Sequence, residues 1–294
     1  MIQLLRLLAM QVALTQQAFY GLVLGIVQGI SEWLPISSKT QILVVSQYIL
    51  GMGFNQAYAF GLFMEIGTIF AAVIYFRKEV VILFRTLFRK DRREESIKLF
   101  NYVLVSTIAT GIIGAPLYLF VDSLQGAYSV AIPMIIIGAV LIGDALLIHY
   151  SRSKYRNDSK RKTLKDLRFR DYAIVGIAQG LAALPGVSRS GATTSTLLVM
   201  NVEAGEAFRL SFIDMILATG GAVALTLVAS RHSISSSIGL VGGYGIIIAI
   251  VAATAISLLL IDFLLKIAKK SSIVYLVSAL GIIAIAGGLI AVLL

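Results

Sequence analysis

Residues 184–194 read LPGVSRSGATT, a concentration of hydroxyl groups around one arginine in an otherwise very apolar chain. Arg189 offers a planar fork of N–H donors that matches phosphate oxygens, with Ser188, Ser190 and Thr193 beside it. Glycine lets backbone N–H groups approach an anion, and serine can cap a helix whose N-terminus favours negative charge. These residues indicate a phosphate site. A plain turn between two helices, with Arg189 reaching the surface, is the alternative.

A second polar stretch, SEWLPISSKTQ, interrupts the apolar sequence at residues 31–41. It carries the carboxylate of Glu32 and a serine pair that ends at Ser38. Beside a phosphate site this carboxylate could bind a cation that bridges phosphate oxygens, or accept the proton of a serine. The alternative is an ion pair with Arg189 or Lys39 that only closes the fold.

The composition identifies the surroundings of these polar stretches. Of the 294 residues, 58% are hydrophobic and the mean hydropathy is +0.91, whereas soluble domains are about 45–50% apolar. The chain is therefore predicted to be an integral membrane protein. The absence of cysteine excludes a disulfide framework, thiol chemistry and a thiolate metal site. The first 17 residues show no clear small-residue cleavage site, so we expect a retained N-terminal helix rather than a signal peptide.

The positive charge is concentrated in two segments. The formal net charge is +10, and of the 25 Lys and Arg residues eight lie in 77–98 and nine in 152–170. Basic loops between apolar spans are typical of the cytoplasmic side of a membrane protein, so loops 77–98 and 151–170 are expected to face the cytoplasm. They do not form a face for nucleic acid, and no nucleic-acid partner is expected.

The chain contains short apolar runs and longer ones. The runs 18–30 and 42–50, and two runs within 172–201, are each too short to cross a bilayer, which takes about 20 residues. A polar break between two half-helices predicts a re-entrant hairpin whose break is buried in protein or lines a wet cavity. The predicted fold is an all-α polytopic membrane protein with about six transmembrane helices and two re-entrant hairpins. The predicted spans are residues 58–76, 100–121, 128–150, 207–229, 238–265 and 273–294.

The two hairpins resemble each other at an offset of about 150 residues. GIVQGI at 25–30 matches GIAQGL at 176–181, and in both cases Leu-Pro and then serine follow. Because the basic loops make the two halves enter the membrane from opposite sides, the halves are predicted to be inverted repeats. Broken helices at matching places in such repeats indicate a binding site near the membrane midplane. The repeats are 17–150 and 172–294, joined by the basic cytoplasmic loop 151–171 within a single membrane domain, 1–294.

If the two hairpin tips meet, their polar residues form one site. Each tip runs from proline through serine into an apolar half-helix, so two helix N-termini and Arg189 would create a pocket that favours anions. Glu65 and Asp214 lie in the spans that follow the hairpins, and either could reach this pocket. The candidate residues are Gln28, Glu32, Ser37, Ser38 and Gln41 from the first half, and Gln179, Ser188, Arg189, Ser190 and Thr193 from the second.

Both motifs resemble those of one known family, the undecaprenyl-diphosphate phosphatases of the bacitracin-resistance type. LPGVSRSGAT at 184–193 nearly reproduces that family's PGTSRSGAT signature, and QGISEWLPISS at 28–38 fits its EGxxEFLPxSS box. The similarity covers nearly the whole chain. It implies removal of the terminal phosphate of a polyprenyl diphosphate, at a site that opens to the outer face and uses a divalent cation, Mg²⁺ or Ca²⁺. The family's functional positions fall on Glu32, Ser38, Ser188, Arg189 and Thr193.

Three positions depart from the family's pattern. The family has glutamate where this chain has Gln28, histidine where it has Gln41, and usually glutamine where it has Glu65. One carboxylate is thus lost from the first hairpin and one is gained in the next span. We hypothesise that Glu65 replaces the missing acid and binds the cation together with Glu32.

The preferred function is a polyprenyl-diphosphate phosphatase of the cell membrane, a hydrolase of phosphoric anhydride bonds that gives the lipid monophosphate carrier. Ser38 would be the nucleophile, with Glu32 as its base or as a metal ligand, while Arg189 stabilises the transferred phosphoryl group. Attack by a metal-activated water is equally consistent with the sequence. The alternative function is a polyprenyl-phosphate transporter, since inverted repeats with broken helices are typical of transporters. The sequence does not fix the oligomeric state, and a homodimer is compatible with it.

Overall fold

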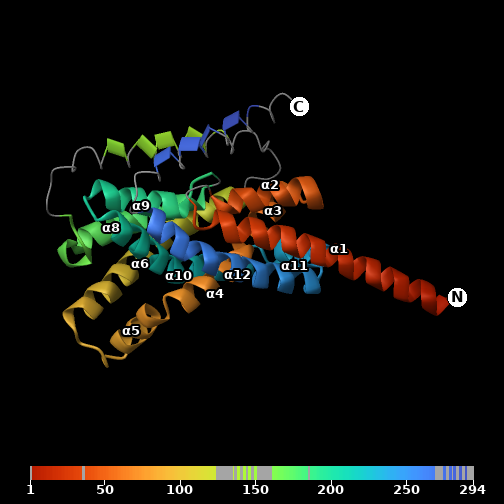
Figure 1. Cartoon of the computed structure of the whole chain (residues 1–294), viewed down its shortest axis with the longest axis horizontal. Helices are drawn as coiled ribbons and strands as arrows, with labels where there is room; N and C mark the ends of the chain where they lie inside the picture. The colour runs from red at the N-terminus through yellow and green to blue at the C-terminus, as the bar shows by residue number, and fades with distance from the viewer. Residues whose placement is uncertain are drawn as a thin grey trace.

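The computed structural model describes residues 2–34, 37–123, 161–184 and 186–268, and isolated positions between 135 and 150 and between 274 and 289. Within these residues the chain forms helices and no strand, apart from one isolated bridge between Lys162 and Val202. Figure 1 shows the helices packed as an elongated bundle, from which the N-terminal part of α1 extends at one end and α5 at the other.

The described α-helices are either long, with 26 or 30 residues, or short, with 10 to 13 residues. In order they are α1 Ile2–Ser31, α2 Ser38–Leu50, α3 Phe54–Met64, α4 Ile66–Tyr75, α5 Arg77–Leu87, α6 Glu94–Ser123, the 3₁₀ turn η1 Leu164–Asp166, α8 Phe169–Gly180, η2 Leu181–Ala183, α9 Arg189–Val199, α10 Ala204–Ala229, α11 Arg231–Val241 and α12 Gly243–Ala268. The short helices α2, α8 and α9 surround the two polar breaks, as the sequence predicts.

Several helices of the described part are long and apolar enough to cross a membrane. The predicted spans 58–76, 100–121 and 207–229 are confirmed, and 238–265 begins instead with the separate helix α11, which ends before Gly242 at a positive φ of 80°. The chain is therefore an all-α, multi-pass membrane protein. The predicted spans 128–150 and 273–294 lie outside the described residues except for isolated positions. The spanning candidates are Arg6–Ser31, Phe54–Tyr75, Glu94–Ser123, Ala204–Ala229 and Gly243–Lys266.

The first helix corrects one prediction. The sequence predicts a half-helix at 18–30, but this run is the C-terminal part of a 30-residue helix that begins at Ile2. Residues 2–17 contain neither proline nor glycine, so nothing separates them from the apolar run that follows. The first hairpin therefore consists of one long helix and one short helix, whereas both helices of the second hairpin, α8 and α9, are short.

Glycines bring two pairs of helices into close contact. On α1, Gly25 and Gly29 face α12, and a Cβ added to Gly25 would lie 2.5 Å from the carbonyl oxygen of Ala249. On α8, Gly176 faces α6, and a Cβ added there would lie 2.3 Å from the carbonyl oxygen of Ser106. Small residues four apart let membrane helices approach closely enough for backbone contact. The same device thus packs the first helix of each hairpin.

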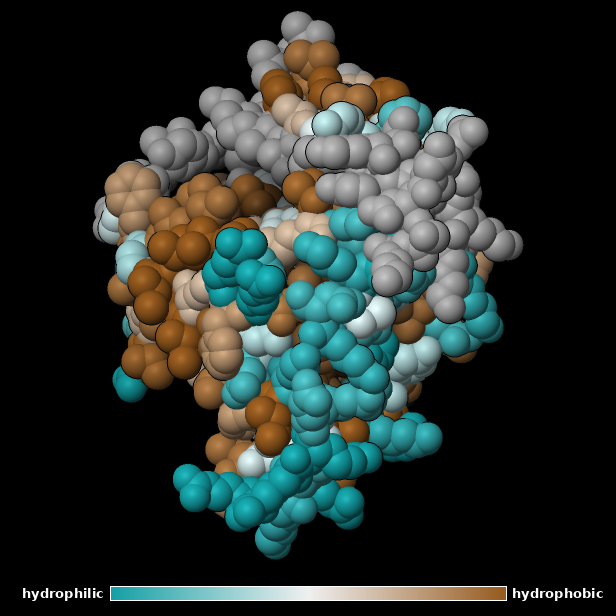
Figure 2. All heavy atoms as spheres, turned by 90° about the vertical axis from the view of Figure 1, so that its left-hand side faces the viewer, coloured by the Kyte–Doolittle hydropathy of each residue, from teal (hydrophilic) through white to brown (hydrophobic). Residues whose placement is uncertain are grey.

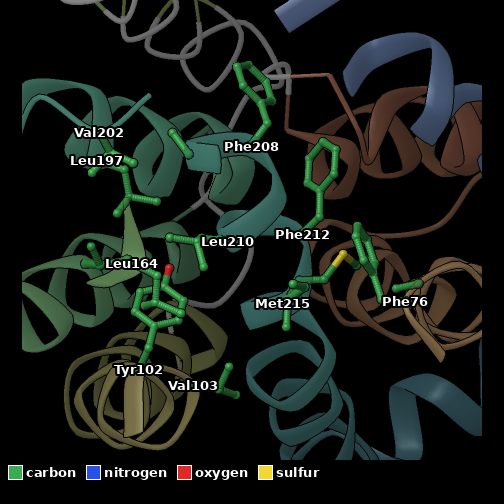
Figure 3. Close-up of a cluster of buried hydrophobic side chains, with 14 of the residues drawn as sticks. Phe76, Tyr102, Val103, Leu164, Leu197, Val202, Phe208, Leu210, Phe212 and Met215 are labelled. Atoms are coloured by element: carbon green, nitrogen blue, oxygen red, sulfur yellow. The ribbon is translucent and has the colours of Figure 1, made fainter. Parts of the chain in front are cut away.

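A buried hydrophobic cluster ties the first hairpin to α10. Figure 3 shows Phe208, Leu210, Phe212 and Met215 of α10 among side chains from several other helices. Trp33, at the tip of the first hairpin, is fully buried and meets Phe212 edge to face, with 4.9 Å between the ring centroids. Such aromatic contacts add to the burial of apolar area, so the tip is held in one position.

Apolar and charged residues occupy different parts of the surface. Val228 is 80% exposed and Leu259 is 77% exposed on two of the spanning helices, as expected where side chains face lipid. Hydrophilic residues gather at the end of the molecule where α5 lies (Figure 2). There the Arg93 side chain and backbone N–H donate to Asp91 and hold the pKa of that carboxyl well below its usual range. This pair fixes the turn between α5 and α6.

Candidate active site

The two hairpin tips lie against each other. The Ser190 hydroxyl donates to the carbonyl oxygen of Leu34 at 3.2 Å, and the Gly186 N–H donates to the Thr40 hydroxyl at 3.2 Å. These bonds join segments about 150 residues apart in the sequence. The predicted meeting of the two motifs is therefore confirmed.

Each tip also begins a helix, as predicted. Ser188 caps α9 by accepting the Gly191 N–H at 3.2 Å, and the helix proper starts at Arg189. Ser37 precedes α2 with a left-handed φ of 55°, a conformation that costs a residue other than glycine about 1–2 kcal/mol. Strain of this kind concentrates at functional sites, where the surrounding structure maintains it.

Glu32 is the hub of the polar contacts at the junction. Its Oε1 accepts Arg189 Nη2 at 2.6 Å, and its Oε2 accepts the Ser38 hydroxyl at 2.6 Å and Gln28 Nε2 at 2.9 Å. Glu32, Gln28 and Ser38 are all buried. The ion pair expected as the alternative is present, but the same carboxylate also accepts a hydrogen bond from the Ser38 hydroxyl. That second contact is the geometry of a general base and its nucleophile.

Arg189 has donors to spare. Only its Nη2 is bonded, to Glu32 and at 3.3 Å to the sulfur of Met215, whereas Nε and Nη1 are buried without a hydrogen-bond partner in the described structure. Buried donors without partners are costly, so an anion that accepts from them would be strongly favoured. The guanidinium fork suits a phosphate group.

A cavity of about 280 Å³ lies beside the junction. Its charged residues are Lys39, Glu65 and Arg189, and the rest of its wall is mostly apolar or small. A polar end against an apolar wall suits an amphiphilic ligand. Its other residues are Leu62, Thr107, Thr110, Gly111, Gly114, Ala115, Tyr118, Gln179, Gly180, Ala182, Ala183, Ala218, Thr219, Gly221, Ala222 and Leu225.

The cavity stops short of the serine. Arg189 lines it, whereas Glu32 and Ser38 do not. Because the Arg189 guanidinium lines the cavity and is bonded to Glu32, it connects the cavity to the Glu32–Ser38 pair.

Lys39 is a site residue that the sequence interpretation did not include among its candidates. It is 6% exposed, lines the cavity, and donates from Nζ to the carbonyl oxygen of Ala182 in the second hairpin. From the sequence, Lys39 is expected only as one alternative ion-pair partner of Glu32. The available signal was a lysine directly after the serine pair and before an apolar helix, because such a lysine is buried only where its charge is compensated.

Asp214 belongs to a second buried polar group. Its carboxylate accepts the Ser106 hydroxyl at 2.5 Å and Gln179 Nε2 at 3.1 Å, and Gln179 also donates to the Thr110 hydroxyl at 3.0 Å. Gln179 lines the cavity, as expected for a site residue, whereas Asp214 lies behind it. Of the two acids that the sequence placed within reach, Glu65 is the one on the cavity wall.

The remaining candidates support the tips rather than line the cavity. The Ser37 hydroxyl lies 3.1 Å from that of Thr40, and Ser188 and Ser190 bond within the second tip. The Thr193 hydroxyl donates to the Arg189 carbonyl at 2.9 Å and lies 2.5 Å from the Ser211 hydroxyl on α10. Gln41 is half-buried on the first turn of α2. Of the candidate residues, Arg189, Gln179 and Glu65 line the cavity.

The carboxylates do not fit a divalent cation in this arrangement. Both oxygens of Glu32 already accept hydrogen bonds, and Glu65 lines the same cavity as the positive charge of Lys39. Across the described residues, no three His, Cys, Asp or Glu side chains are grouped so that they could hold a metal ion. A divalent cation held by Glu32 and Glu65 stays a prediction from the resemblance.

Comparisons with known proteins identify the family of this chain. The family model of bacitracin resistance protein BacA matches residues 21–286. Three curated relatives, each named undecaprenyl-diphosphatase, come from Saccharolobus solfataricus (51% identical over 270 residues, 92% of this chain and 95% of the relative), Sulfurisphaera tokodaii (47% over 274 residues, 93% and 98%) and Pyrobaculum aerophilum (38% over 272 residues, 92% and 97%). Because the match extends over nearly the whole chain and includes both motifs of the site, this chain belongs to the bacitracin resistance protein BacA family.

Proposed function

We propose that the protein is a membrane hydrolase that removes the terminal phosphate of a polyprenyl diphosphate such as undecaprenyl diphosphate. Its relatives carry the name undecaprenyl-diphosphatase. The observation that carries the proposal is the Ser38 hydroxyl at 2.6 Å from Glu32, whose other oxygen is 2.6 Å from Arg189. These are a nucleophile, its base and a phosphate-binding cation in one buried unit. The apolar wall of the cavity is suited to the isoprenoid next to the diphosphate.

Reaction begins when the substrate's phosphate binds Arg189, which lines the cavity, and draws it from Glu32. Ser38 Oγ then bonds to the terminal phosphorus while its proton passes to Glu32. The bond from phosphorus to the bridging oxygen breaks, and the polyprenyl monophosphate leaves with the electron pair and takes the proton from Glu32. Water hydrolyses the phosphoserine, again with Glu32 as the base, and restores Ser38.

The other residues of the junction have supporting parts in this proposal. Arg189 and the N-terminal N–H groups of α9 stabilise the charge on the transferred phosphoryl oxygens. Ser188, Ser190 and Thr193 hold this helix end in place and offer hydroxyl groups to the phosphate. Ser37, Gln28, Gln41 and Gln179 complete the proposed phosphate-binding set.

Phosphate release by the purified protein tests the proposal. Glu32→Gln is expected to lower kcat about 10²- to 10⁴-fold, since a general base contributes that much, and Ser38→Ala should abolish turnover and the labelling of the protein by substrate ³²P. Ser31→Ala is the matched control, because the buried Ser31 hydroxyl bonds only to the carbonyl oxygen of Val27, at 2.5 Å. Folded Ser38→Ala protein with wild-type turnover would assign the attack to water instead. A wild-type protein that binds substrate without releasing phosphate would exclude the hydrolase.

The membrane arrangement we propose has two re-entrant hairpins in inverted repeats. The packing of Gly25 and Gly29 against α12 and of Gly176 and Gly180 against α6 supports it, since the two glycine pairs are related by the sequence offset of the motifs. Gln28 and Gln179, also at that offset, each donate to a buried acid. The proposed repeats remain 17–150 and 172–294.

The proposed orientation places the basic loops 77–98 and 151–170 in the cytoplasm and opens the site toward the outer face. The positive-inside rule supports it. No observation favours the transporter alternative, and the relatives are named as diphosphatases. The homodimer stays a prediction.

A further inference from the structure

The side chain of Lys39 is buried at the polar end of the cavity. It is 6% exposed, and of its three ammonium N–H donors only one has a partner in the described chain, the carbonyl oxygen of Ala182. A lysine is almost never buried without compensation, because removing its charge from water costs several kcal/mol. The two remaining N–H donors would therefore be stabilised by an anionic ligand or by a carboxylate.

The carboxylate that faces Lys39 is itself incompletely bonded. Glu65 is 4% exposed and lines the same cavity, at the break between α3 and α4, and no described residue donates a hydrogen bond to its carboxylate. The charged groups that act on Lys39 are Glu65 and Glu32, which attract it, and Arg189, which repels it. Lys39 and Arg189 thus present two positive charges to one cavity, opposite an acid that binds neither of them directly.

We propose that Lys39 binds the diphosphate of the lipid substrate as a built-in cation, so that hydrolysis by this chain does not require a divalent metal ion. The inference rests on the proposed function. In phosphoryl transfer a metal ion bridges and neutralises the phosphate oxygens. Here both Glu32 oxygens accept hydrogen bonds and Glu65 shares the cavity with Lys39, whereas Lys39 and Arg189 together carry the charge of a divalent cation.

A purely structural role makes a different prediction. If Lys39 only joined α2 to η2 through the carbonyl oxygen of Ala182, its loss would lower stability and leave the response to metal unchanged. Lys98 provides the matched control, because its Nζ donates to the carbonyl oxygen of Lys165 at 2.7 Å at the basic end of the molecule. Both lysines join separate segments, but Lys98 does not line the cavity.

The experiment measures phosphate release from polyprenyl diphosphate by the full chain, with EDTA and with added Mg²⁺ or Ca²⁺. We expect wild type to be as active in EDTA as with metal. Lys39→Met should lower kcat/KM in EDTA about 10- to 100-fold, as for loss of a charged hydrogen bond, and Mg²⁺ should restore part of this loss through the freed Glu65. Lys39→Arg should retain most activity, and Lys98→Met should match wild type in both conditions.

Two results would overturn the inference. Wild type that is active with metal but inactive in EDTA shows that the metal is required, and it leaves the proposed hydrolase intact. Equal activity of Lys39→Met and Lys98→Met in both conditions shows that Lys39 does not hold the diphosphate. Wild type that releases no phosphate in either condition overturns the proposed function, and this inference with it.

Discussion

The Arg189 guanidinium is only partly hydrogen-bonded. One end is bonded to Glu32 at 2.6 Å, and the remaining donors, Nε and Nη1, have no hydrogen-bond partner in the described structure. An incompletely satisfied, buried guanidinium is poised to exchange a carboxylate for a phosphate. Phosphate binding by Arg189 therefore depends on the planar geometry of its guanidinium group and not on its charge alone.

Arg189→Lys tests this dependence. Lysine keeps the charge but loses the bidentate geometry, so we expect kcat/KM for phosphate release to fall about 100-fold or more. Arg209→Lys is the control, because Arg209 pairs with Glu79 and Glu206 and lies outside the cavity. An Arg189→Lys protein as active as Arg209→Lys would show that a point charge suffices.

The elements that carry the site are held by glycine contacts. The first helix of each hairpin, α1 or α8, lies so close to its neighbour that an added Cβ would meet backbone atoms at 2.5 Å for Gly25 and 2.3 Å for Gly176. In lipid the hydrophobic effect does not drive helices together, and close packing between them takes its place. The positions of the tips thus depend on these contacts far from the chemistry.

Gly25→Ala and Gly176→Ala should each lower the stability of the protein in detergent by about 1–3 kcal/mol, because the extra methyl group overpacks a helix contact. Gly220→Ala is the matched control on α10, where an added Cβ meets nothing within 4 Å. This control should be neutral or slightly stabilising, as alanine favours a helix. The midpoint of thermal unfolding measures all three. Equal midpoints for the three variants would contradict the role of the glycine contacts.

At the scale of the whole molecule, charge and hydropathy define two ends and a lipid-facing side. Basic residues of the described chain gather at the end with α5, and α11 lies at the other end of the bundle (Figure 1). Exposed apolar side chains such as Val228 and Leu259 lie on the spanning helices between these ends. This distribution supports one orientation in the membrane.

Cysteine labelling tests that orientation directly, since the chain contains no cysteine. Lys90→Cys, in the exposed turn after α5, should be protected from a membrane-impermeant maleimide in intact cells, while Ser235→Cys on α11 should react. Both should react after the membrane is permeabilised. Reaction of Lys90→Cys and protection of Ser235→Cys in intact cells would reverse the proposed orientation.

Both motifs of the site could be found from the sequence, for a physical reason. An arginine inside an apolar chain is costly, so an arginine clustered with hydroxyl groups marks a function. The repeat of GIVQGI and GIAQGL then indicated that the two clusters meet, as the bond between Ser190 and Leu34 bears out. The extent of α1 was mispredicted, because the end of a helix has a sequence signal only where a residue interrupts it, and residues 2–17 offer none.

By itself the sequence determined the class of the protein, its motifs and its candidate residues, because hydropathy and residue type are local properties. Only the tertiary structure decided which side chains share a surface. It placed Lys39 beside Glu65 in the cavity, turned Glu32 toward both Ser38 and Arg189, and set Asp214 behind Gln179. Such contacts join residues far apart in the chain, so they depend on how helices pack, which no single stretch of sequence records.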